Sequence, residues 1–80
     1  MAGMIKAVID TGSAAMRAEL YEKLGFGKLD DVREGFTFVA YDQEAKTIAI
    51  IDPLGARDLA KNHGWKRYIR IEEFYKDMGL

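Results

Sequence analysis

The chain has 80 residues, of which 49% are hydrophobic and 31% charged, a composition that is typical of a folded domain and excludes a disordered chain. It has no cysteine, which excludes disulfides and thiolate metal sites. Lys and Arg number 12 against 13 Asp and Glu, a balance that excludes a general electrostatic attraction to nucleic acid or anionic lipid. We therefore expect one domain over residues 1–80.

The first elements are a strand and a helix. Met4–Asp10 alternates apolar residues on one face and predicts the strand. A turn through Thr11, Gly12 and Ser13 then leads into a helix from about Ala14 to Leu24, with Ser13 or Thr11 as N-cap. Gly25 suits the left-handed position that ends a helix, and Phe26 supplies the apolar contact that accompanies such a cap.

A β-hairpin is predicted next. Phe36–Tyr41 and Thr47–Asp52 form its strands and Asp42–Lys46 its turn, whereas Gly27–Gly35 is a loop or an irregular edge strand. The hairpin strands are apolar on both faces, so both faces need cover. Because 80 residues leave little chain for two covering layers, we expect a homodimer.

The last elements are a helix, a strand and a second short helix. Asp52-Pro53 opens a helix through about His63 that Gly64 closes. Trp65–Ile71 predicts a strand with Trp65 and Ile69 in the core, and a helix follows over 72–78. The order β-α-β-β-α-β-α predicts an α+β fold, a small two-layer sandwich with a mainly antiparallel sheet.

The most specific motif is Asp10-Thr11-Gly12-Ser13, which follows an apolar run. It resembles the active-site signature of retropepsin-like aspartic peptidases, which work as homodimers. The resemblance implies that Asp10 is catalytic and shares a proton with its twin, that Thr11 and Gly12 support it, and that a strand follows the motif. The apolar period after the motif is helical, however, which favours a capping turn in which Asp10 is structural.

A second resemblance lies in Leu20–Phe26, whose string Leu-Tyr-Glu-Lys-Leu-Gly-Phe is similar to segments of GNAT acetyltransferases and of vicinal-oxygen-chelate proteins. Those families imply an acetyl-CoA loop or His and Glu metal ligands on strands, and the sequence shows neither. An amphipathic helix with a glycine stop explains the string. We therefore expect no metal and no cofactor.

Binding residues are the remaining candidates. Lys61–Arg70 interleaves cations with aromatic residues, as nucleic-acid sites do, although a solvated strand face explains the pattern better. Arg17 projects from the apolar stripe of the first helix, which suggests an interface arginine. The full set of candidate anchors is Arg17, Tyr21, Trp65, Arg67, Tyr68 and Arg70.

These observations favour a non-enzymatic protein-binding module, such as an accessory protein of a phage or mobile element that binds and inhibits a host protein. A homodimeric aspartic peptidase and a nucleic-acid-binding protein are the alternatives. Met1–Ile9 lacks a secretory signal, and Ile48–Ile51, the longest wholly apolar run, cannot cross a bilayer. We expect a cytoplasmic protein without a membrane partner.

Overall fold

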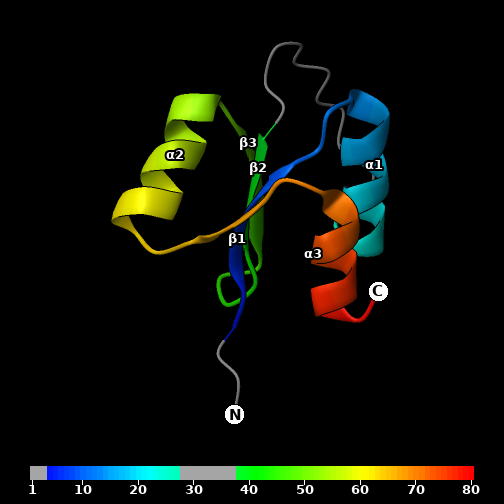
Figure 1. Ribbon diagram of the computed structural model, residues 1–80. Coiled ribbons are helices and arrows are strands. Elements are labelled where there is room, and N and C mark those ends of the chain that lie inside the picture. Colours follow the sequence, from blue (N-terminus) through cyan, green and yellow to red (C-terminus); the bar gives the residue numbers. More distant parts are fainter. Residues whose placement is uncertain (1–3, 28–37) are drawn as a thin grey trace.

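The computed structural model describes residues 4–27 and 38–80. In this part of the chain seven elements follow one another in the predicted order (Figure 1). Their bounds are β1 Lys6–Asp10, α1 Ala14–Lys23, β2 Phe38–Asp42, β3 Thr47–Ile51, α2 Pro53–Asn62, β4 Lys66–Tyr68 and α3 Ile71–Met78. The α+β class is thus confirmed. The loop or edge strand expected for Gly27–Gly35 lies outside the described residues, apart from Gly27.

The ends of α1 are fixed by its own sequence. The Ser13 side chain accepts a hydrogen bond from the Met16 N–H at 3.2 Å, so Ser13 is the N-cap. Gly25 has a φ of 86°, and the Phe26 N–H returns to the Tyr21 carbonyl at 2.9 Å. This is the glycine stop that the sequence predicts.

The helix α2 likewise begins and ends where the sequence predicts. Asp52 is its N-cap and accepts from the Gly55 N–H at 2.6 Å, with Pro53 in the first turn.

Among the described residues, no helix combines the length and apolar character that a membrane crossing requires.

The four strands form one mixed sheet in the order β3-β2-β1-β4. β2 is antiparallel to both β1 and β3, whereas β4 is parallel to β1. It follows that β1, β3 and β4 run in one direction, so that their carboxyl ends lie at the same end of the sheet. Each of these strands leads directly into a helix, so α1, α2 and α3 all begin at that end of the sheet (Figure 1).

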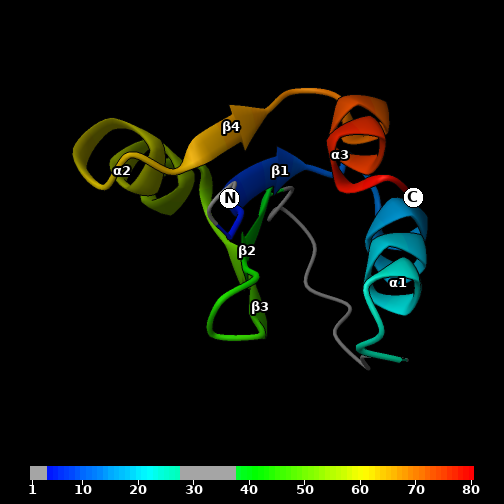
Figure 2. The same ribbon diagram turned by 90° about the horizontal axis from the view of Figure 1, so that it is seen from below.

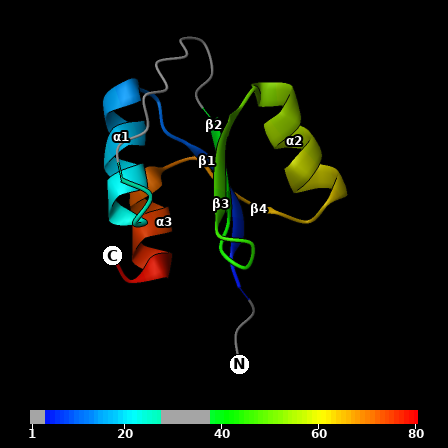
Figure 3. The same ribbon diagram turned by 180° about the vertical axis from the view of Figure 1, so that it is seen from behind.

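Helices cover both faces of the sheet. α1 and α3 lie against one face, and α2 lies against the other (Figures 2 and 3). The larger core forms on the first face, where Ile9 and Tyr41 pack with Leu20 and Phe74. The smaller core forms on the second face, where Val8 and Phe38 pack with Ala56 of α2.

The covering of the second face goes beyond the two layers that the sequence predicts. α2 looks like a surface helix because Ala56 is its only fully buried residue, yet this small side chain lets the helix approach the sheet closely. One chain therefore supplies cover for both apolar faces of β1 and β2. The sequence predicts a homodimer because both faces need cover, and the helices of a single copy already supply this cover.

The last strand is shorter than predicted. β4 ends at Tyr68, whereas the sequence predicts a strand to Ile71, because α3 already begins at Ile71. Ile69 was expected in the core but is 72% exposed, so that expectation is wrong. Trp65 does pack, half-buried, against the smaller core.

Candidate functional site

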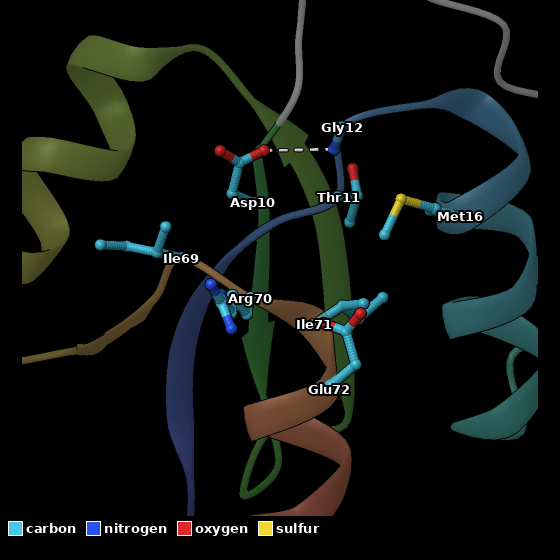
Figure 4. A pocket seen from close by; sticks show the side chains of 8 residues that line it. All are labelled: Asp10, Thr11, Gly12, Met16, Ile69, Arg70, Ile71 and Glu72. Atoms are coloured by element: carbon cyan, nitrogen blue, oxygen red, sulfur yellow. Dashed lines mark hydrogen bonds between the residues drawn. The ribbon is translucent and has the colours of Figure 1, made fainter.

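A pocket of about 300 Å³ opens where β1 and β4 end. Parallel strands leave room between their carboxyl ends, because the chain departs from each strand toward its own helix. Here β1 departs toward α1 and β4 toward α3. The lining residues, shown in Figure 4, are Asp10, Thr11, Gly12, Met16, Ile69, Arg70, Ile71 and Glu72.

The turn after β1 forms one wall of this pocket. The Asp10 Oδ1 atom accepts a hydrogen bond from the Gly12 N–H at 3.1 Å, drawn as a dashed line in Figure 4. Gly12 has a φ of 70°, a conformation that costs a residue with a Cβ atom about 1–2 kcal/mol. Thr11 is fully buried. Asp10 thus folds over its own backbone in an Asx turn, which stabilises the bend.

The peptidase resemblance implies a strand after this motif, and that implication is wrong. The chain enters α1 at Ala14, one residue after the Ser13 cap. One oxygen of the Asp10 carboxylate, Oδ1, accepts a hydrogen bond within the turn. This geometry agrees with the capping role that the helical period predicts.

The opposite wall mixes charge with apolar surface. Arg70 and Glu72 come from the start of α3, and in the described part of the chain neither forms an ion pair with the other or with Asp10. The apolar lining is Met16, Ile69 and Ile71. In Figure 4 the Met16 side chain extends from α1 toward the turn, and Ile69 points away from it.

This arrangement suits the binding of a long basic side chain. The two carboxylates outnumber the single guanidinium, and the apolar residues can pack along an aliphatic stem. His63, the only histidine, lies at the far end of α2, where its Nε2 is 3.5 Å from Asp58. Residues 4–27 and 38–80 contain no cluster of three metal-ligating side chains.

Half of the six binding residues predicted from the sequence lie inside the molecule. Arg17, Tyr21 and Tyr68 are each at most 5% exposed. Trp65 is half-buried, and only Arg67 and Arg70 are exposed. A buried side chain offers little area to a partner, so the structure leaves these two arginines as the accessible members of the set.

Tyr68 has a structural role instead. Its hydroxyl donates to the Asp77 Oδ2 atom at 2.7 Å, and the Lys66 Nζ atom lies 2.9 Å from the same oxygen. Burial and the hydrogen bond to Asp77 raise the pKa of Tyr68, while Lys66 and Tyr68 lower the pKa of Asp77. The contact fastens the end of α3 to β4.

The cations and aromatic residues of Lys61–Arg70, which the sequence suggests as a nucleic-acid site, differ in their surroundings. Tyr68 is buried, Lys66 is paired with Asp77, and the Arg67 guanidinium lies 5.5 Å from the centre of the Phe38 ring. The cations of this segment therefore do not line one groove with its aromatic residues.

The sequence did not identify Met16, Ile69, Ile71 or Glu72 as site residues. All four follow the ends of β1 and β4, and their proximity depends on the parallel pairing of the first strand with the last, Ala7 with Lys66 and Ile9 with Tyr68. A prediction of that pairing would have located the pocket.

Fold and site together define a small α+β domain with a mixed four-stranded sheet and a surface pocket at the carboxyl ends of two parallel strands. Comparison with protein-family models, with curated proteins and with solved structures finds no match to this chain.

Proposed function

We propose that this protein is a non-enzymatic binding module whose partner is another protein. In this proposal a basic side chain of the partner, lysine or arginine, enters the pocket between β1 and β4. Its aliphatic stem packs on the half-buried Met16, and its charge faces Asp10 and Glu72.

One observation carries the proposal: a pocket lined by two carboxylates and one guanidinium, which form no ion pair with one another, lies beside an isoleucine that is 72% exposed. Protein interfaces combine apolar anchors with charged groups at their rim. Ile69 supplies the anchor, and the exposed Arg67 and Arg70 supply flanking charges. A pocket of about 300 Å³ fits one such side chain and is at the small end for a separate small-molecule ligand.

The test is a pull-down from host lysate with immobilised protein. Ile69→Asp should lose the partner, because it places a charge at the centre of the proposed interface. Glu72→Gln should weaken capture about twofold to fivefold at low salt, because it removes one of the two carboxylates that would face the cation.

The chain offers a matched control. Leu54 is 75% exposed, much like Ile69, but lies at the start of α2. Leu54→Asp should retain the partner. Equal losses with both variants, or no loss with Ile69→Asp, would show that the pocket is not the docking site. The narrower hypothesis, inhibition of a host protein by a phage or mobile-element product, requires that the captured protein lose activity when bound.

A further inference from the structure

The two edges of the sheet differ in chemistry. At one edge β4 has three residues, and two of them, Lys66 and Arg67, are exposed cations. At the other edge β3 has the sequence Thr-Ile-Ala-Ile-Ile, with no charge, proline or glycine. Charged residues, proline and bulges are the usual means by which edge strands avoid pairing with another chain. β4 has such protection, and β3 lacks it.

No described helix shields the β3 edge. α2 packs against β1, β2 and β4, and the core on the other face places Ile48 and Ile50 at its margin. Thr47 and Ala49 are exposed, and the three isoleucines of β3 are half-buried. In the view of Figure 2, β3 lies at the end of the sheet opposite β4.

The hydrogen-bonding phase of β3 follows from that of its neighbours. The Gln43 N–H donates to the Ile5 carbonyl at 2.9 Å, which extends the β1–β2 register by one pair. Backbone groups of an antiparallel strand point to alternate sides. Tyr41 and Val39 therefore point toward β1, and Asp42, Ala40 and Phe38 toward β3.

The residues that pair with those last three are Thr47, Ala49 and Ile51. Their backbone groups point toward β2. By the same alternation the N–H and C=O groups of Ile48 and Ile50 point outward, away from the sheet. Residues 4–27 and 38–80 contain no strand beyond β3 with which these N–H and C=O groups could form hydrogen bonds.

We infer that two copies of this chain pair through β3, antiparallel and centred on Ala49, to form one continuous eight-stranded sheet. In this register residue i of one copy lies opposite residue 98 − i of the other. Ile48 then faces Ile50 of the second copy, and these are the two residues of β3 whose backbone groups pair with no strand in the described part of the chain. A two-fold axis at Ala49 therefore pairs the residues whose backbone groups already point outward.

Charge complementarity selects this register. It places Lys46 opposite Asp52 of the second copy at both ends of the paired strands. Lys46 forms no ion pair with another described residue, and Asp52 uses only its Oδ1 atom for the α2 cap. On the face that α1 and α3 cover, Ile48 of each copy also becomes the cross-strand neighbour of Ile50 in the other. Such aliphatic cross-strand pairs stabilise a sheet.

The inference does not use the pocket, so the two proposals fail or stand separately. Amide hydrogen exchange read by NMR over a concentration series tests it most directly. Protection of the Ile48 and Ile50 amides should rise with protein concentration, while the Thr47, Ala49 and Ile51 amides, which already bond to β2, should be protected throughout. Protection of Ile48 and Ile50 that is independent of concentration would overturn the inference.

Sedimentation equilibrium with one substitution supplies the second test. Ala49→Lys places two like charges opposite each other on the symmetry axis, at a position that is exposed in the single chain. The dimer Kd should rise about tenfold or more. The control is Ala18→Lys, the same substitution at an exposed position of α1, which should leave the Kd unchanged. A monomer at all concentrations, assemblies larger than two, or a dimer that Ala49→Lys leaves intact would each refute pairing through β3.

Discussion

Two substitutions of Asp10 distinguish a structural role in the Asx turn from a catalytic role. Asp10→Asn keeps a side-chain oxygen that can accept the Gly12 N–H, whereas Asp10→Ala removes the acceptor. The affected bond is 3.1 Å long and exposed, and a bond of this kind contributes about 0.5–1.5 kcal/mol to stability. A change of about 1 kcal/mol shifts the Tm of a domain of this size by about 4–8 °C.

The assay is thermal unfolding followed by circular dichroism, together with peptide hydrolysis at acidic pH. Asp10→Ala should lower the Tm by several degrees. Asp10→Asn should stay close to the wild type, because both Asn and Asp form Asx turns with the N–H two residues on. Neither variant nor wild type should cleave peptides. The reasoning is refuted if Asn destabilises as much as Ala, or if the wild type cleaves peptides and Asp10→Asn abolishes the cleavage without a loss of Tm.

Two further predictions concern residues of α3. Phe74 is fully buried and makes edge contacts with the rings of Tyr41 and Tyr68, so Phe74→Ala should cost about 3–5 kcal/mol in urea unfolding and Phe74→Leu clearly less; equal losses would contradict a packing role. Asp77 has a lowered pKa, so its contribution to stability is present above the ordinary value of 3.8 and is lost as the pH falls through the folded-state pKa. Asp77→Asn should therefore be less stable than the wild type at pH 7, and the difference should shrink below about pH 4. A difference that stays constant with pH would show that the Lys66 and Tyr68 contacts do not lower this pKa.

The local parts of the fold were predictable because their signals lie within a few residues. The Ser13 cap, the Gly25 stop and the Asp52-Pro53 helix start each depend on bonds to neighbours three or four positions away. The hairpin turn was predictable for the same reason: the Ala45 N–H donates to Asp42 within the turn.

The segment after β4 was predicted wrongly because its pattern does not distinguish strand from helix start. Tyr68, Ile69 and Ile71 are all apolar, and no glycine or proline marks the point where β4 gives way to α3. Tyr68 and Ile71 enter the core, and Ile69 between them is left exposed. The site was missed for a related reason, since the pairing of β1 with β4 joins segments about sixty residues apart.

The cationic edge of β4 limits how many copies can join. A head-to-tail contact between β3 of one molecule and β4 of the next would leave both ends of the assembly open, and repetition would produce a fibre. Lys66 and Arg67 make that contact unfavourable, because an incoming apolar strand would have to desolvate their charges. In the proposed dimer the β3 edges of both copies would be paired with each other, so that no further copy could add and growth would stop at two.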